Sequence, residues 1–222
     1  MTRIRAVIFD MDGVLLEAKE WHYEALNRAL AHYGHVITRQ EHLTTYDGLS
    51  TRRKLEMLTR EHDLPASFHD RINDLKQQYT LELIESLCEP LPIHEFALAT
   101  LKSEGYVVGL ASNSIRQTVD VAMERANLAQ YFDFTLSNQD VCKPKPHPDI
   151  YLAAMDRASA LPSECVVVED NHHGVEAATR AGGHVCRVGS VYDVTYNRIR
   201  GFIDAIETPA EAADRVNERR AA

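Results

Sequence analysis

Asp10 and Asp12, separated by one residue and followed by Gly13, are the side chains whose types and spacing point most directly to chemistry. They follow Ile4–Phe9, a short apolar run rich in β-branched and aromatic residues, which predicts a buried strand. Because side chains alternate along an extended chain, both acids face the same side, and Gly13 lets the chain turn away at once. Ligands of open α/β sheets bind at the carboxyl ends of strands. The pair therefore predicts a site, although an acidic turn would also fit.

A second acidic pair, Glu169-Asp170, ends the apolar run Val166–Val168. Two like charges at ~4 Å repel by roughly 4 kcal/mol at an effective dielectric constant near 20, so converging acids need a cation. All the candidate ligands are oxygens, which favours Mg²⁺ over zinc. Read alone, Glu169-Asp170 would also fit the cap of a following helix.

Polar residues also follow a second predicted strand, and a lysine lies in a proline-rich loop. Ser112-Asn113 follows the predicted strand Tyr106–Ala111 and precedes a predicted helix. A hydroxyl and free backbone N–H groups at a helix N-terminus suit a phosphate, although Ser112 alone also fits a helix N-cap. Lys145 is the cation expected on a transferring phosphoryl group, and Lys143 competes for that role.

These segments together resemble the four signature motifs of the haloacid dehalogenase superfamily of phosphotransferases. The resemblance covers nearly the whole chain. Only Lys145 is followed by the x-Pro-Asp-Ile-Tyr pattern, which favours it over Lys143. The four matching segments are Asp10-x-Asp12-Gly13-Val14, Ala111-Ser112-Asn113, Lys145-Pro146-x-Pro148-Asp149-Ile150-Tyr151 and Val168-Glu169-Asp170.

The resemblance implies a role for each motif residue. Asp10 is the expected nucleophile, which forms an aspartyl-phosphate, and Asp12 is the expected general acid and base. In this family a Mg²⁺ ion is held by the first acid, the backbone carbonyl of the second and a distal acid. Here these are Asp10, Asp12 and Asp170, with Glu169 as a further direct or water-mediated ligand. Ser112, Asn113 and Lys145 are expected to bind the phosphate.

The composition and net charge limit the classes of function that the chain can have. The chain has 222 residues, 45% of them hydrophobic and 26% charged, as in a soluble protein with one core domain and an insertion, or with two small domains. A formal net charge of −9 disfavours nucleic acid and anionic membranes as partners but allows a small phosphorylated metabolite. We expect a monomer.

The cysteines and the N-terminus point to the cytoplasm. The four cysteines are scattered without a C-x-x-C pair, which is typical of free thiols in a reducing compartment. No signal-peptide core precedes Asp10, and no apolar run approaches the ~20 residues that span a bilayer.

Hydrophobic periodicity divides the chain into two parts. Residues 17–87 have a helical pattern, with expected helices around Trp21–Ala29, from Ser50 or Thr51 through Leu58, and over about 67–87. On the third helix we expect one face to hold Ile72, Leu75, Tyr79, Leu83 and Leu87.

After the return linker Pro90-Leu91-Pro92, strands and helices alternate. This predicts a Rossmann-like, doubly wound parallel sheet over residues 1–16 and 90–222, with an inserted all-α cap domain at 17–89. The expected strands are Tyr106–Ala111, Phe132–Leu136, Cys165–Val168, His184–Val188 and Phe202–Ile206; the expected helices are Ser114–Asn127, His147–Ala158, Val175–Ala181 and one starting at Thr208.

An insertion after the first motif is typical of the helical-cap branch of the superfamily, in which the cap closes over the site. We expect hinges at Leu15–Lys19 and Glu89–Ile93. The cap residues expected to face the core are His22 and Tyr46–Ser50, including Gly48, with Arg52, Arg53 and Lys76 as further contacts.

Within that branch the chain resembles the β-phosphoglucomutases at Glu169-Asp170 and at Glu20-Trp21-His22. It departs from them in the cap, where Asp47-Gly48-Leu49-Ser50-Thr51 replaces the Lys-Gly-x-x-Arg pattern and loses both basic residues. Since a mutase must hold a bisphosphate against the cap, the loss disfavours a mutase.

The sequence therefore predicts a Mg²⁺-dependent phosphatase of small phosphate monoesters, sugar phosphates in particular. A β-phosphoglucomutase-type phosphomutase and a non-catalytic metabolite-binding module remain alternatives. Dehalogenation and phosphonate hydrolysis are disfavoured because neither needs Asp12. His172 and His173 stay open between surface residues and substrate contacts.

Overall fold

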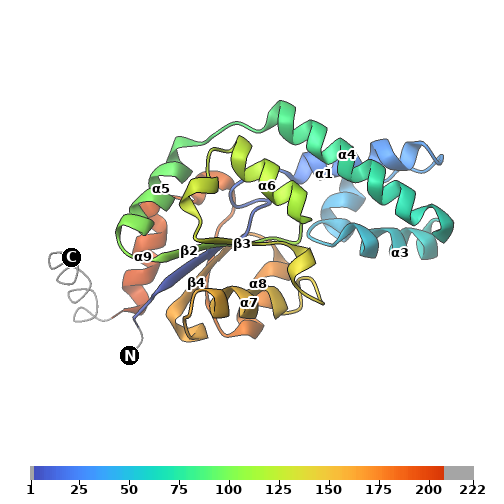
Figure 1. Cartoon of the computed structure of the whole chain (residues 1–222). Coiled ribbons are helices and arrows are strands. Elements are labelled where there is room, and N and C mark those ends of the chain that lie inside the picture. The colour runs from blue at the N-terminus through green and yellow to red at the C-terminus, as the bar shows by residue number, and fades with distance from the viewer. Residues whose placement is uncertain (1–2, 208–222) are drawn as a thin grey trace.

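The computed structural model describes residues 3–207. Five parallel strands form one sheet in the order β3-β2-β1-β4-β5. The strands are β1 Ala6–Phe9, β2 Val107–Ala111, β3 Phe134–Leu136, β4 Cys165–Glu169 and β5 His184–Arg187. The predicted doubly wound parallel sheet is thus confirmed: β1 is the central strand, and helices lie on both sides of the sheet (Figure 1).

The register of the central strand brings the motif residues to one edge. Phe9 of β1 lies opposite Leu110 of β2 and Val168 of β4. The next residue of each strand, Asp10, Ala111 and Glu169, therefore lies at the same edge of the sheet. The backbone N–H of Asp10 donates to the Val168 carbonyl at 3.0 Å, which continues the pairing into the site.

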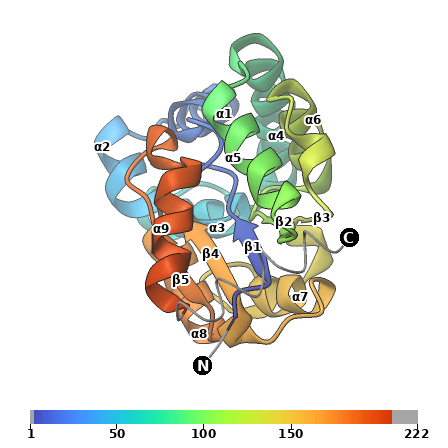
Figure 2. The same ribbon diagram turned by 90° about the vertical axis from the view of Figure 1, so that its left-hand side faces the viewer.

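Two layers of helices cover the sheet, as alternating apolar side chains on buried parallel strands require. Val7 and Phe9 face α5 (Pro92–Ser103), α6 (Arg116–Arg125) and α9 (Tyr196–Ile206). Ala6 and Ile8 face α7 (Asp149–Arg157) and α8 (His172–Ala181). Figure 2 shows α5 and α9 side by side on the first of these faces.

Helices α1 (Lys19–Ala31), α2 (Arg39–Glu41), α3 (Thr51–Glu61) and α4 (His69–Leu87) lie together at one end of the molecule (Figure 1), and we call this group of helices the cap. The cap has its own core, which includes Leu26, Leu55 and Ile72. Ser50 caps α3 by accepting the Arg53 backbone N–H. The short helical turns of the chain are His42–Tyr46, Ala66–Phe68, Ala129–Tyr131, Asn138–Asp140, Pro162–Glu164 and Val191–Asp193.

Two segments differ from the sequence-based expectation. Phe202–Ile206 is the end of α9 and not a strand, because Ile199 and Ile203 lie one helical turn apart and are both buried against the sheet. Helix α5 was not predicted: Pro92 occupies its first turn, where a proline starts a helix as readily as it ends one. The helix predicted from Thr208 lies outside the described residues.

The predicted buried face of α4 was partly wrong. The helix buries Ile72, Lys76, Thr80 and Ile84, four residues spaced by one turn, while Leu87 is 51% exposed. Within residues 3–207, none of the helices has the length and apolar character needed to cross a bilayer.

Candidate active site

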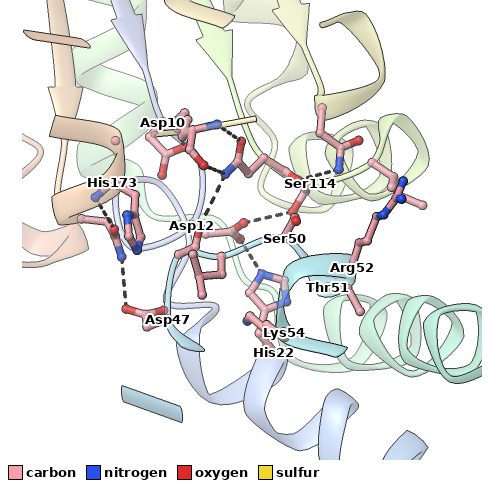
Figure 3. A pocket seen from close by; sticks show the side chains of 18 of the residues that line it. Asp10, Asp12, His22, Asp47, Ser50, Thr51, Arg52, Lys54, Ser114 and His173 are labelled. Atoms are coloured by element: carbon pink, nitrogen blue, oxygen red, sulfur yellow. Dashed lines mark hydrogen bonds and ion pairs between the residues drawn. The ribbon is translucent and has the colours of Figure 1, made fainter. Parts of the chain in front are cut away.

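A pocket of about 280 Å³ lies between the carboxyl ends of the strands and the cap (Figure 3). The sheet side of its lining includes Asp10 and Asp12 after β1, Asn113 and Ser114 after β2, and Glu169 at the end of β4. The cap side includes His22 of α1, residues 47–52 and Lys54 of α3, and Lys76 of α4. The structure therefore joins the acids at the strand ends to the cap in one space.

Lys145 links the two acidic segments. Its Nζ lies 2.6 Å from Asp10 Oδ1 and 2.8 Å from Glu169 Oε1, and it is only 5% exposed. The Tyr151 hydroxyl lies 2.7 Å from the same Nζ and donates to Glu169 Oε1 at 2.6 Å. Burial lowers the pKa of Lys145, but the carboxylates of Asp10 and Glu169 outweigh it and raise the pKa overall. The ammonium therefore stays charged.

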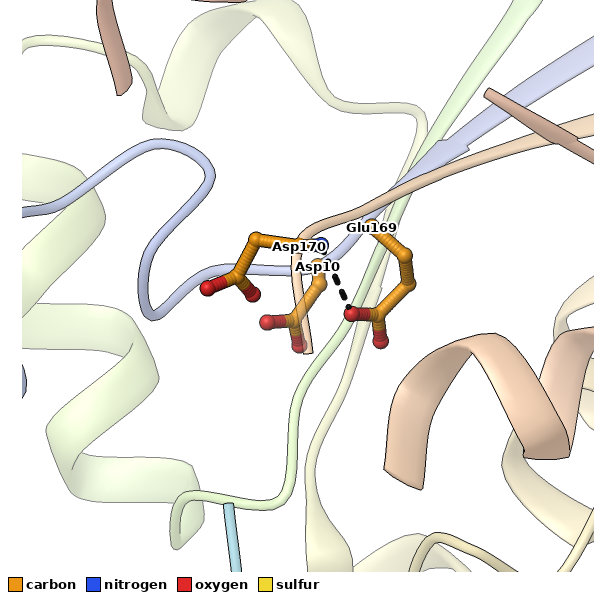
Figure 4. A group of neighbouring side chains, drawn as sticks. All are labelled: Asp10, Glu169 and Asp170. Carbon is orange, nitrogen blue, oxygen red and sulfur yellow. Dashed lines mark hydrogen bonds between the residues drawn. The ribbon is translucent and has the colours of Figure 1, made fainter. Parts of the chain in front are cut away.

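Asp10, Glu169 and Asp170 form a cluster, with one oxygen of each lying within 4.8 Å of the others (Figure 4). Burial, followed by the charge of Glu169, raises the pKa of Asp10 well above its ordinary value, and burial also raises the pKa of Asp170. Asp170 Oδ1 is buried without a hydrogen-bond partner among the described residues. A hard divalent cation such as Mg²⁺ fits this all-oxygen donor set and would offset its charge.

Gly13 and Lys19 complete the surroundings of Asp170. Gly13 has φ +85°, and a Cβ there would lie 2.2 Å from Asp170 Oδ2, so only glycine permits this turn. Lys19, which the sequence indicated only as the end of a hinge, lies 2.9 Å from the same oxygen. Its ammonium offsets part of the carboxylate charge.

Both oxygens of Glu169 are hydrogen-bonded. Oε1 accepts from Lys145 and Tyr151, and Oε2 accepts the backbone N–H groups of Asp170 and Asn171. A Cβ on Gly174 would lie 1.6 Å from Oε1, so α8 can approach Glu169 only with glycine there. Glu169 is therefore held rigidly and in turn fixes Lys145.

The Asp12 carboxylate lies outside this cluster and faces the cap. Its Oδ2 accepts from the Ser114 hydroxyl at 3.1 Å, and its Oδ1 lies 3.2 Å from His22 Nε2. Lys76 Nζ lies 3.3 Å from His22 Nδ1; because an ammonium can only donate, the imidazole proton is assigned to Nε2. Burial raises the pKa of Asp12, but His22 and Ser114 outweigh it and lower the pKa overall.

The predicted phosphate ligands Ser112 and Asn113 occupy different environments. Ser112 is fully buried, its Oγ accepts the Ser114 backbone N–H at 3.0 Å, and it is not part of the pocket lining. Asn113 lines the pocket, and its side-chain amide donates to the Lys145 carbonyl at 3.3 Å and the Gly48 carbonyl at 3.4 Å. Asn113 thus joins the lysine loop to the cap.

Among the predicted cap residues, His22, residues 47–50, Arg52 and Lys76 line the pocket, whereas Arg53 does not and Tyr46 is buried in the core of the cap. Lys54, which the sequence analysis did not single out, lines it and is only 6% exposed. The signal in the sequence is its place one turn after Ser50, within a helix whose start faces the core. Ser114, another lining residue that the sequence did not indicate, directly follows the Ala111-Ser112-Asn113 motif.

The residues left open by the sequence are now placed. Lys143 is exposed and lies outside the pocket lining, so Lys145 alone of the two lines the site. The His172 side chain is 81% exposed, whereas His173 lines the pocket. All four cysteines are free thiols, and Cys142 is the exposed one.

The family model of the haloacid dehalogenase-like hydrolases matches residues 7–188 of this chain. This range includes every motif residue placed above. The chain belongs to this family. A phosphorylated carbohydrates phosphatase of Thermotoga maritima is 33% identical over 81% of this chain and 82% of its own length. The pyrophosphatase PpaX of Bacillus mycoides is 28% identical over 81% of each chain.

Structural comparison agrees with the family assignment. A β-phosphoglucomutase of Clostridium difficile superposes with a TM-score of 0.78 and 22% identity, covering 91% of this chain and 98% of its own. At that identity the likeness shows the shared fold. With phosphatases among its curated relatives, this member of the haloacid dehalogenase-like family is a phosphatase.

Proposed function

We propose that the protein hydrolyses small phosphate monoesters, sugar phosphates in particular, with Mg²⁺ and through an aspartyl-phosphate on Asp10. The observation that carries the proposal is the convergence of Asp10, Lys145, Glu169 and Asp170 at one edge of the sheet, with oxygens of the three acids within 4.8 Å of one another. Asp10 Oδ1 is bound by Lys145, which leaves Oδ2 for attack on phosphorus.

In the proposed reaction, Asp10 forms a bond to phosphorus while the ester P–O bond breaks, and Asp12 gives its proton to the leaving oxygen. Water then attacks the aspartyl-phosphate, passes its proton to Asp12, and frees inorganic phosphate and Asp10. The pKa of Asp12 is lowered in the pocket without substrate. When a dianionic phosphoryl group lies beside the carboxyl group, its charge raises this pKa and favours the protonated acid.

The metal would be held by Asp10, the backbone carbonyl of Asp12 and Asp170, with Glu169 as a direct or water-mediated ligand. When bound, it would offset the negative charge gathered on the acids and the transferring phosphoryl group. Lys145 supplies a second, fixed positive charge. Among the residues expected to bind substrate, Asn113, His22 and Gly48 line the pocket, and Ser112 supports the turn that presents Ser114.

The relatives support the choice of substrate. The Thermotoga maritima protein, named for phosphorylated carbohydrates, favours sugar phosphates, and the PpaX proteins make pyrophosphate the first non-sugar compound to test. The phosphomutase remains the alternative function. It is disfavoured because Asp47–Thr51 lacks the two basic residues of the Lys-Gly-x-x-Arg pattern. We also propose that the chain is a cytoplasmic monomer.

The test is phosphate release by the purified protein from a panel of sugar phosphates and pyrophosphate. The panel includes β-glucose 1-phosphate with and without its bisphosphate, because conversion without free phosphate would identify a mutase. Asp10→Asn should abolish turnover, and the matched control Asp156→Asn, at an exposed residue of α7, should retain it. Wild-type turnover in Asp10→Asn, or undiminished turnover in excess EDTA, would contradict the proposal.

A further inference from the structure

Two lysines of the cap reach the pocket in a buried position. Lys54 of α3 is 6% exposed and Lys76 of α4 is 7% exposed, and both belong to the pocket lining. Lysine is almost never this buried without a partner of opposite charge. Figure 3 shows Lys54 beside His22 on the cap side, across the pocket from Asp10.

Neither lysine has an acid of its own. Over residues 3–207, the Lys54 ammonium makes no hydrogen bond and no ion pair within 4.0 Å, and that of Lys76 contacts only His22 Nδ1. The carboxylates whose charges act on the two lysines are engaged elsewhere: Asp12 contacts His22 and Ser114, and Asp47 lies 3.9 Å from Lys19 and accepts from Asn171. Two buried positive charges are thus left facing the pocket.

Their effect on each other agrees with this geometry. Burial and the charge of Lys54 lower the pKa of Lys76 to about 7. Burial lowers the pKa of Lys54 to about 8, even though Asp47 and Asp12 act in the opposite direction. An anion placed between the two ammonium groups would restore the pKa of both and remove the cost of burying them.

We propose that Lys54 and Lys76 form an anion-binding subsite in the cap that selects substrates with a second acidic group, a phosphate or a carboxylate, at the end remote from the transferred phosphate. This inference rests on the proposed phosphatase function. In the proposed function the transferred phosphate lies at the strand ends, beside Lys145 and a metal that the acid cluster would hold, whereas the subsite belongs to α3 and α4. One pocket of about 280 Å³, near the lower end of the size range of ligand sites, joins the two.

The subsite differs from the one that the sequence showed to be missing. The basic residues of the mutase pattern would stand at Asp47 and Thr51. Lys54 lies one turn beyond Thr51 on α3, and Lys76 comes from a different helix, so the positive charge has been rebuilt from other positions. A neutral, hydroxyl-rich end of a substrate would leave both ammonium groups uncompensated, which is why a second anion is expected.

The test measures binding without turnover, in the Asp10→Asn background, by isothermal titration calorimetry with Mg²⁺ present. Two matched pairs of compounds differ by one acidic group: fructose 6-phosphate with fructose 1,6-bisphosphate, and glucose 6-phosphate with 6-phosphogluconate. The first pair tests a phosphate and the second a carboxylate. We expect the doubly acidic member of at least one pair to bind about 10- to 100-fold more tightly, the range for hydrogen bonds to charged groups.

Variants assign that preference to the lysines. Lys54→Met and Lys76→Met should each reduce it to below about 3-fold, Lys54→Arg should keep it, and Lys143→Met, which removes an exposed lysine outside the pocket, should leave it unchanged. Circular dichroism confirms that each variant is folded. Equal affinity within both pairs, absence of binding by all four compounds, or a preference that survives both methionine variants would overturn the subsite.

Turnover separates this inference from the proposed function. Phosphate release from fructose 6-phosphate and glucose 6-phosphate without any preference for the doubly acidic partners would remove the subsite and leave the phosphatase in place. A Lys54-dependent binding preference in a protein that releases no phosphate from any compound would keep the subsite and remove the phosphatase.

Discussion

Replacing Asp170 by Asn should stabilise the metal-free protein and abolish its response to Mg²⁺. The substitution is nearly isosteric and removes one charge from the cluster with Asp10 and Glu169. At 4.8 Å and an effective dielectric constant of 20, each of these two neighbours repels Asp170 by about 3.5 kcal/mol. Lys19, at 2.9 Å, attracts it by about 6 kcal/mol. Repulsion therefore exceeds attraction by about 1 kcal/mol, and burial adds to the cost of the charge.

The free energy of unfolding of metal-free Asp170→Asn should thus exceed that of the wild type by about 1–2 kcal/mol, or about 2–8 °C in Tm for a chain of this size. Mg²⁺ at a hundred times its Kd stabilises a protein that binds it only when folded by about 2.7 kcal/mol, or about 5–11 °C. The wild type should show this rise and the variant should lack it, so the order of the two Tm values reverses with Mg²⁺.

Thermal unfolding followed by circular dichroism, in EDTA and in excess Mg²⁺, measures both effects. Asp47→Asn is the matched control, because Asp47 also lies near Lys19, at 3.9 Å, but is not part of the acid cluster. It should keep the wild-type response to Mg²⁺. A variant Asp170→Asn that is less stable than the wild type in EDTA, and that gains as much from Mg²⁺, would refute the reasoning.

The pH dependence has a definite sign. Because the folded state raises the pKa of Asp170 above its ordinary value of 3.8, the folded protein binds this proton more tightly than the unfolded chain does. The metal-free wild type should therefore gain stability, relative to Asp170→Asn, as the pH falls through the range just above 3.8. Asp10 acts in the same direction, so the variant reduces the slope without removing it.

Three further predictions concern Lys145, His42 and two glycines. Lys145→Met leaves Asp10 and Glu169 buried without their shared cation, so urea denaturation should show a loss of about 3–5 kcal/mol, and phosphate release should stop; a loss below about 1 kcal/mol would contradict the account. Burial lowers the pKa of His42 to about 4, so the unfolded chain takes up this proton at a higher pH than the folded protein does. The free energy of unfolding of the wild type should therefore fall by about 2–3 kcal/mol between pH 6.5 and 4, and His42→Phe should lack this decrease. Gly174→Ala should displace Glu169 and lower kcat, because a Cβ there collides with the Glu169 carboxylate. Gly201→Ala, with open space around its Cβ in α9, should raise the free energy of unfolding by about 0.5–1 kcal/mol. If the two variants changed Tm and kcat by the same amounts, the role assigned to Gly174 would be wrong.

The sequence could predict which residues meet at the site because the carboxyl ends of parallel strands share one edge. Each motif acid ends or directly follows an apolar run that could only be a buried strand, so Asp10, Glu169 and Asp170 had to converge once the sheet was parallel. This inference needs the direction of the strands and not their exact ends. It was therefore unaffected by differences of one or two residues at the strand boundaries.

The prediction failed where local pattern is ambiguous and tertiary contacts decide. Phe202–Ile206 is too short for its hydrophobic periodicity to distinguish a strand from a helix. The segment forms a helix because Ile199 and Ile203, one turn apart, are then both buried. Helix α5 is obscured because Phe96, in its middle, is 64% exposed and blurs the apolar stripe. In both cases the deciding neighbour is the sheet face, which no window of sequence contains.

The cap could be predicted as helical, and His22, Gly48, Arg52 and Lys76 could be predicted to face the core, but the burial of Lys54 and Lys76 could not. A lysine on an amphipathic helix is expected on the solvated face, so nothing local to Lys54 or Lys76 indicates burial. Only the assembled pocket shows that α3 and α4 direct positive charge toward the acids of the strand ends.

This charge separation bears on the order in which the site fills. With the acids on the sheet side and Lys54 and Lys76 on the cap side, an anionic substrate meets repulsion at one end and attraction at the other. A cation held by Asp10, Glu169 and Asp170 would remove this repulsion, after which both ends of a doubly acidic substrate would be favoured. Phosphate release by the wild type from such a substrate should therefore fall far more on removal of Mg²⁺ than on replacement of Lys54 by Met, because only the metal acts where the charges are most crowded.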